Sequence, residues 1–199
     1  MSELSRRDLL RVIGTTVLAA GTVDAAGAQQ VHRMTKKARV ASGGVYRPKA
    51  LTAHEYKTLE RLTDLIVPVE DGRPGALAAA AAAWIDMLAS GNAELAAIYT
   101  GGIGWLDREM TRRGGTTFVS APDSGQIAML DLIAYRKNES PGLGPGIRFF
   151  GWVRKMTVDA FYTSEIGIKD LDYQGNRPQL TFEVPARSLE HALKKSGLV

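Results

Sequence analysis

The 199-residue sequence contains no cysteine, and this absence removes several kinds of chemistry. Without thiols the chain has no disulfide framework, no cysteine nucleophile, no thiolate metal site and no ligands for an iron–sulfur cluster. Histidine is nearly as scarce, with only His32, His54 and His191, so a histidine-rich metal site is not expected. The lack of disulfides does not assign a compartment, because a domain of this size can be secreted without them.

Two structural patterns are also missing. The apolar run at residues 12–23 contains Gly14, Thr15 and Thr16 and falls well short of the roughly 20 residues that a membrane-spanning helix needs. No series of alternating polar and apolar residues predicts a sheet, whereas apolar residues at helical spacing recur from residue 51 onwards. We therefore expect an all-α fold: a compact multi-helix domain with an irregular, loop-rich C-terminal third and a short extended piece at residues 180–184.

The sequence contains no complete motif for catalysis. His54-Glu55 resembles the start of a zinc-binding His-Glu-x-x-His helix, but Thr58 stands where the second histidine is needed. The glycine-rich residues 142–146 contain Pro145, which lacks an amide, and no Gly-Lys-Ser/Thr follows them. No Gly-x-Ser-x-Gly elbow occurs. The sequence thus predicts no catalytic, cofactor-binding or metal-binding residue in this chain, and His54 is expected to be a solvated surface side chain.

Charge is distributed unevenly. The formal net charge is +4, from 25 basic and 21 acidic residues. Residues 29–50 contain no acid and are poor in apolar residues, which predicts a basic linker, or an arm that orders only on a partner. Nucleic acid is not expected as that partner, because no aromatic platform accompanies the basic side chains. The basic residues of this arm are Arg33, Lys36, Lys37, Arg39, Arg47 and Lys49.

The first 28 residues have the pattern of a twin-arginine export signal. The motif consists of Ser5, Arg6, Arg7, Leu9 and Leu10, and a moderately apolar run follows it. Ala26 and Ala28 then form a small-x-small cleavage site, which makes Gln29 the expected mature N-terminus. The alternative is an amphipathic N-terminus that happens to contain two arginines. The predicted organisation is a signal peptide at 1–28, a basic arm at 29–50 and one helical domain at 51–199.

A helix predicted at residues 147–162 organises the C-terminal half. Phe149, Trp152, Val153, Met156 and Ala160 share one face, a second apolar stripe lies beside it, and the polar strip is narrow. We therefore expect this helix to be packed on most of its circumference. After it, the helical period gives way to residues rich in glycine, asparagine and other turn formers, up to residue 176.

These segments resemble the gluconate 2-dehydrogenase subunit 3 family. The resemblance covers roughly residues 50 to 180. It is carried by the order and spacing of several short motifs: Leu51-Thr52-Ala53-His54-Glu55-Tyr56, Trp105-Leu106-Asp107, Phe161-Tyr162-Thr163-Ser164, Glu165-Ile166-Gly167 and Asp172-Tyr173-Gln174-Gly175-Asn176.

The resemblance implies a non-catalytic small subunit of a periplasmic sugar, polyol or sugar-acid dehydrogenase. In such complexes a large FAD-containing subunit performs the oxidation and a cytochrome c subunit with haem often accepts the electrons. The small subunit supplies the export signal and, like a chaperone, stabilises its partner. Membrane association would then occur only through the complex, or transiently through the signal peptide. The absence of cysteine departs from those family members that have cysteines.

Tyr162 and Tyr173 lie in or next to a turn-rich segment and suggest where the flavoprotein binds. A large ring with a polar tip is typical of interface hot spots. We expect the interface to include part of the basic arm and Tyr162, Thr163, Ser164, Tyr173, Gly175 and Asn176. Two other functions stay open from the sequence: a free-standing exported enzyme and a binding module of the cell envelope.

Overall fold

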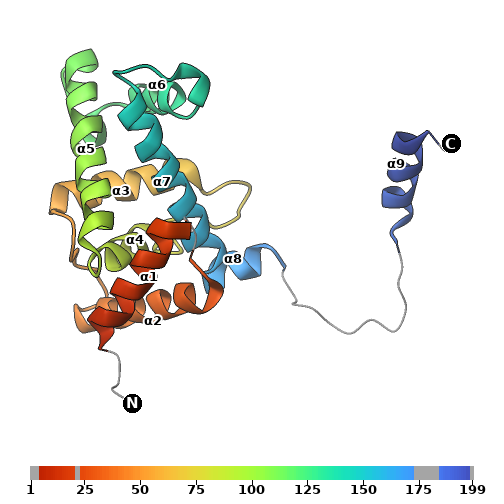
Figure 1. Cartoon of the computed structure of the whole chain (residues 1–199), viewed down its shortest axis with the longest axis horizontal. Helices are drawn as coiled ribbons and strands as arrows, with labels where there is room; N and C mark the ends of the chain where they lie inside the picture. The colour runs from red at the N-terminus through yellow and green to blue at the C-terminus, as the bar shows by residue number, and fades with distance from the viewer. Residues whose placement is uncertain (1–4, 21–22, 173–183, 198–199) are drawn as a thin grey trace.

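The computed structural model describes residues 5–20, 23–172 and 184–197. Within these ranges the chain is α-helical, with two short 3-10 turns and no strand, which confirms the all-α prediction (Figure 1). The helices are α1 (Arg6–Ala20), α2 (Ala25–Ala41), α3 (Ala53–Ile66), α4 (Ala81–Ala89), α5 (Ala93–Gly114), α6 (Asp123–Ile133), α7 (Gly144–Tyr162), α8 (Glu165–Asp170) and α9 (Ala186–Ser196), and the 3-10 turns are η1 (Phe118–Ser120) and η2 (Arg136–Asn138).

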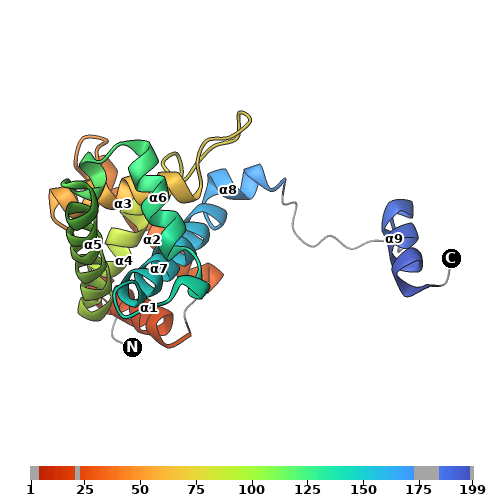
Figure 2. The ribbon, with the colours of Figure 1, turned by 90° about the horizontal axis from the view of Figure 1, so that it is seen from above.

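Helix α4 lies at the centre of the bundle. All of its residues are buried, and it contacts α1, α2, α3, α5 and α7 (Figure 2). An entirely buried helix is expected to be apolar all round, and α4 is, apart from Asp86. The alanine-rich run from Ala76 predicts a helix over residues 76–89, but α4 begins only at Ala81, because the preceding residue, Ala80, has a left-handed backbone with φ 54°.

Helix α7 crosses α4 and also contacts α3, α5, α6 and α8. The residues of both predicted apolar stripes are buried, except Trp152, which is partly buried, and this confirms that the helix is packed on most of its circumference. The closest approach is to α5, where a Cβ added at Gly102 would lie 2.0 Å from Cδ2 of Phe149. Gly102 is therefore required by packing, whereas a Cβ at neighbouring Gly101 would meet no heavy atom within 4 Å in the described structure.

The sequence pattern Thr52-x-x-Glu55 predicts a capping box, and Asn92 before an apolar helical run predicts an N-cap; both form, with Asn92 accepting from the Leu95 amide at 2.9 Å. Ser120 with Asp123 gives the same pattern, but the prediction of a cap by Ser120 is wrong. Ser120 ends the turn η1, and the N-cap position of α6 is Pro122, with no side-chain bond.

The N-terminal arm differs most from the sequence-based expectation. Residues 29–41 were predicted to be linker or unstructured arm, but they belong to α2, in which Ala28, Val31 and Thr35 are buried. The apolar signal was weak because two of these three inward side chains are small or polar. Similarly, α8 forms where turns were expected after residue 162, whereas the extended piece predicted at 180–184 lies outside the described residues except for Val184. Among the described residues, no helix combines the length and apolar content that crossing a bilayer requires.

Candidate functional site

Helix α2 is attached to the bundle by a small set of specific polar contacts. The Gln29 side chain donates from Nε2 to the Thr163 carbonyl at 2.7 Å, and His32 Nε2 lies 3.0 Å from Thr163 Oγ1. Trp84 of α4 donates from its indole nitrogen to the Ala28 carbonyl at 3.2 Å, and its ring lies 5.8 Å from that of His32. We call these five residues the clasp. The clasp joins the start of α2 to α4 and to the end of α7.

The hydrogen bonds of the clasp fix the state of its histidine. The Thr163 hydroxyl donates to the Asp159 carbonyl at 2.6 Å, so its oxygen is left to accept from His32. His32 therefore has its proton on Nε2. Burial lowers the pKa of His32 from 6.5 to about 4, which keeps the ring neutral near pH 7.

The outward face of α2 has the opposite character, because it carries exposed cations. We call the six basic side chains of residues 29–50 the cationic ridge. None of them forms an ion pair within 4.0 Å in the part of the chain that the structure describes. Four, Arg33, Lys36, Lys37 and Arg39, project from α2 itself, and Arg47 and Lys49 follow it.

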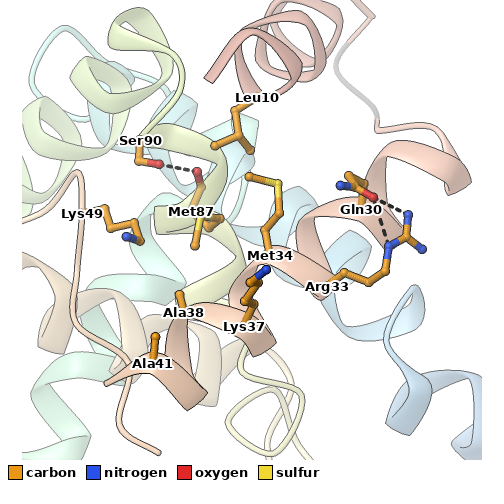
Figure 3. Close-up of a pocket in the computed structure, with 10 residues that line it drawn as sticks. All are labelled: Leu10, Gln30, Arg33, Met34, Lys37, Ala38, Ala41, Lys49, Met87 and Ser90. Carbon is orange, nitrogen blue, oxygen red and sulfur yellow. Dashed lines mark hydrogen bonds between the residues drawn. The ribbon is translucent and has the colours of Figure 1, made fainter. Parts of the chain in front are cut away.

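Two clefts flank this ridge. The first, of about 580 Å³, lies between α1, α2 and α4. Figure 3 shows Met34 reaching from α2 towards Leu10 and Met87, with Lys37 and Lys49 beside this apolar centre. An apolar cleft with cations at its edge suits an acidic surface that has protruding apolar side chains. The complete lining is Leu10, Gln30, Arg33, Met34, Lys37, Ala38, Ala41, Lys49, Met87 and Ser90.

The second cleft, of about 500 Å³, lies on the neighbouring face of α2. Its other walls are residues 78–80 and residues 164–166, at the start of α8. Val40, at its edge, is 73% exposed, and Arg33 lines both clefts. The structure thus brings the basic arm beside the segment that follows α7. Both regions belong to the predicted partner interface, and the structure shows that they line the same cleft.

The individual residues predicted for that interface divide into three groups. Tyr162 is 40% exposed and packs edge-on against Phe161. Thr163 and Ser164 make internal contacts instead: Thr163 is part of the clasp, and buried Ser164 caps α8 by accepting from the Gly167 amide at 3.0 Å. Their hydroxyls are already used within the chain, and their place in the partner interface stays a prediction. Tyr173, Gly175 and Asn176 lie outside the described residues.

Sequence reasoning missed Asp86, the buried carboxylate of α4. It accepts four hydrogen bonds: from the Tyr46 hydroxyl at 2.8 Å and from the amides of Lys49, Ala50 and Leu51 at 2.7, 3.0 and 2.9 Å. Burial and the Asp86 carboxylate raise the pKa of Tyr46, so the phenol stays protonated and donates. Asp86 thereby fixes the loop that holds Lys49 at the first cleft. Its position in the otherwise apolar run 81–89 was the available signal.

The described residues contain no group of three or more His, Cys, Asp or Glu side chains that could hold a metal ion. His54, expected to be merely solvated, is paired with Asp107 at 2.6 Å, and the other oxygen of Asp107 accepts from the Phe118 amide at 2.9 Å. The pair joins two of the motifs that carry the family resemblance. It links the start of α3 to α5 and η1.

The predicted export signal lies in α1. Arg6, Arg7 and Leu9 are in its first turn, and their side chains are not among those that the structure describes. Leu10, which follows them, is buried. At the predicted cleavage site Ala26 is exposed, but Ala28 is fully buried within the first turn of α2, where it belongs to the clasp. Cleavage there would require this turn to unwind.

The fold and this site define a helical protein whose most distinctive surface is a cationic ridge flanked by two clefts. Residues 53–179 match the family described as gluconate 2-dehydrogenase subunit 3, and the chain belongs to that family. The match begins at the first residue of α3, so α1, α2 and the cationic ridge lie before it. No curated protein and no solved structure matches the chain.

Proposed function

We propose that this chain is the non-catalytic small subunit of a periplasmic flavin-dependent dehydrogenase that oxidises a sugar, polyol or sugar acid. It supplies the twin-arginine export signal and stabilises a large FAD-containing subunit, which performs the chemistry. A cytochrome c subunit accepts the electrons. The observation that carries the proposal is the family match over residues 53–179, because the family's name describes a subunit of gluconate 2-dehydrogenase.

The surface of α2 supports a role in binding. Cations that have no ion pair within the chain gain more from a partner's carboxylates than cations already paired, and they speed the encounter with an acidic surface. The two clefts add apolar area beside these charges. Val40 is exposed at the second cleft, and Tyr162, which is 40% exposed, precedes by two residues Ser164, which lines that cleft. We assign the flavoprotein interface to the cationic ridge, the two clefts and Tyr162.

Export of the assembled complex follows from the same proposal, because the twin-arginine route carries folded cargo. A single signal on the small subunit would then export both proteins. Replacing Arg6 and Arg7 together by lysine keeps the charge but removes the pair that the pathway recognises. We expect both the chain and the flavin dehydrogenase activity to remain in the cytoplasm. Export of the lysine variant by the same route would contradict the assignment of the signal.

The binding role is tested by isolating the affinity-tagged chain from cells that make it naturally. We expect a co-purifying flavoprotein with sugar-acid, polyol or sugar dehydrogenase activity, which the chain alone lacks. Lys36→Glu with Lys37→Glu reverses one charge beside each cleft, and we expect it to lower the recovery of flavin at least about tenfold. Lys194→Glu with Lys195→Glu in α9 is the matched control. Turnover by the isolated chain, or equal recovery from both variants, would overturn the proposal or its interface.

A further inference from the structure

We propose that α1 is an intramolecular ligand of its own domain. It occupies a groove beside α4 and the start of α2 in the free chain, and it leaves this groove when the flavoprotein binds the cationic ridge. The export signal would then be withheld until assembly. The release step rests on the proposed function, whereas the docking of α1 stands on the contacts of this chain alone.

The first observation is the burial of one face of α1. Leu10, Ile13 and Val17 follow one another at i, i+3 and i+7, and their exposed fractions are 5%, 7% and 0%. The opposite face is open to solvent, with Val12 56% exposed and Thr15 also exposed. This helix therefore lies on the bundle by its apolar stripe, as a surface helix of a folded domain does.

The second observation is a close steric fit between α1 and the bundle. A Cβ at Gly91, just after α4, would lie 2.2 Å from Cβ of Leu10 and 3.0 Å from its backbone carbon. A Cβ at Gly14 of α1 would lie 2.7 Å from Cβ of Asn92. Real Cβ atoms do not approach other atoms so closely, so a glycine on each side is needed for α1 to reach this position. Such mutual fit is not required of an export signal that acts only as a free tail.

The docked position conflicts with use of the signal. A receptor that binds the apolar stripe needs the same three side chains that the bundle buries, so docking and recognition exclude each other. The apparent affinity of the receptor for the chain is then reduced by the fraction of molecules in which α1 is undocked. A signal that is docked in about 99% of molecules is recognised about 100-fold less well.

The first cleft provides the connection to the partner. Leu10 forms one of its walls, and Arg33, Lys37 and Lys49 of the cationic ridge form others (Figure 3). A partner that binds the ridge and fills this cleft contacts α1 directly. If it binds more tightly when α1 is absent, it shifts the equilibrium towards the undocked state by that difference in affinity.

Hydrogen exchange on the full chain tests the docking. We expect the amides of residues 10–17 to exchange about 100-fold more slowly than in an unfolded chain. Gly14→Leu should reduce this protection at least about tenfold because it collides with Asn92, whereas Thr15→Leu on the exposed face of the same helix should leave it unchanged. Exchange at the unfolded rate in the unmodified chain, or equal protection in both variants, would overturn the docking.

The groove is tested from the other side by Gly91→Leu, with Gly101→Leu as the control at an open helical position. Gly91→Leu should release residues 10–17 while the amides of α7 keep their protection, and it should increase the fraction of chain exported in the absence of the flavoprotein. Retained protection of residues 10–17 would contradict the proposal.

The release step is measured in the complex. There we expect residues 10–17 to lose their protection, and protection that persists would overturn release while leaving the proposed function intact. A chain that forms no complex would refute the proposed function and release together, while docking is still decided on the free chain.

Discussion

The bundle formed by α3 to α8 and the N-terminal pair α1 and α2 hold together in different ways. The bundle buries whole helices: every residue of α4 is inside, and α7 buries two adjoining stripes. Among the side chains that the structure describes, α1 buries Leu10, Ile13 and Val17 and α2 buries Ala28, Val31 and Thr35, and α2 depends in addition on the polar clasp. The family match covers the bundle and omits the pair. Extensive burial makes the bundle a scaffold, whereas α1 and α2 are each attached by one face and leave the opposite face exposed to solvent.

Asp86 is the point where the two regions depend on each other. It belongs to the most buried helix of the bundle, yet its four hydrogen bonds all go to residues 46–51, which follow the pair. Removing this carboxylate should therefore disturb the scaffold and the cationic ridge together.

The largest effect is predicted for Asp86→Ala. The substitution leaves four buried or part-buried donors without their acceptor, so we expect the free energy of unfolding to fall by about 3–5 kcal/mol in chemical denaturation. Asp131→Ala, at an exposed position of α6, is the control and should change it by less than about 0.5 kcal/mol. A loss below about 1 kcal/mol for Asp86→Ala would show that the loop is not held by this residue.

A smaller effect within the bundle is predicted for Gly102→Ala. The added methyl group collides with Phe149, and overpacking of this kind costs about 1–3 kcal/mol. Gly101→Ala makes the same chemical change one position earlier, where the side chain meets open space. There we expect a gain of about 0.5–1 kcal/mol from helix propensity. Thermal unfolding of the two variants should shift in opposite directions, and equal shifts would contradict the close packing of α5 on α7.

The smallest effect on stability is predicted for the N-terminal helices α1 and α2, because the clasp that holds α2 depends on pH. The pKa of His32 is lowered to about 4 in the folded chain by burial, so between pH 6.5 and 4 the unfolded chain binds a proton that the folded chain does not. The stability that the folded chain has with neutral His32 is fully present above pH 6.5, and the free energy of unfolding decreases as the pH falls from 6.5 towards 4. Because His32 is only partly buried, we expect a modest loss, about 3 °C in melting temperature between pH 7.5 and pH 5.

Other groups also titrate in this range, so the measurement is made against His32→Gln, which keeps a hydrogen-bond donor near Thr163 but has no ionisable ring. The unmodified chain should lose more stability than the variant on acidification. Its amide exchange should rise in α2 before it rises in α7. Identical pH profiles of the two proteins would refute the role of His32.

The sequence determined the helical bundle well because its signals are local. Helix α3 is capped by Thr52 and Glu55 and helix α5 by Asn92, and all three are visible in the sequence. Helix α7 forms as its apolar stripes predict. Local signals failed where a helix is held by a few distant contacts. Helix α2 buries Ala28, Val31 and Thr35, and its polar anchors come from Trp84 and Thr163, far along the chain.

The candidate site shows the same limit. The charges of the arm and the tyrosine at 162 could be picked out from the sequence, since exposed cations and aromatic residues are visible as residue types. Their arrangement could not, because it depends on the clasp bringing residues 29 and 32 to residue 163. Ser164 was assigned to a partner surface for this reason, although its hydroxyl is used within the chain.

By itself, therefore, the sequence determined the helical class, the absence of thiol chemistry, the twin-arginine pattern and the uneven charge, all of which follow from residue type and short-range spacing. Only the tertiary structure decided that residues 29–41 of the basic arm are helical, that Asp86 fixes the loop after them and that α1 packs against α4. Those features depend on contacts between residues far apart in sequence, whose free energy is gained only when the whole bundle has formed.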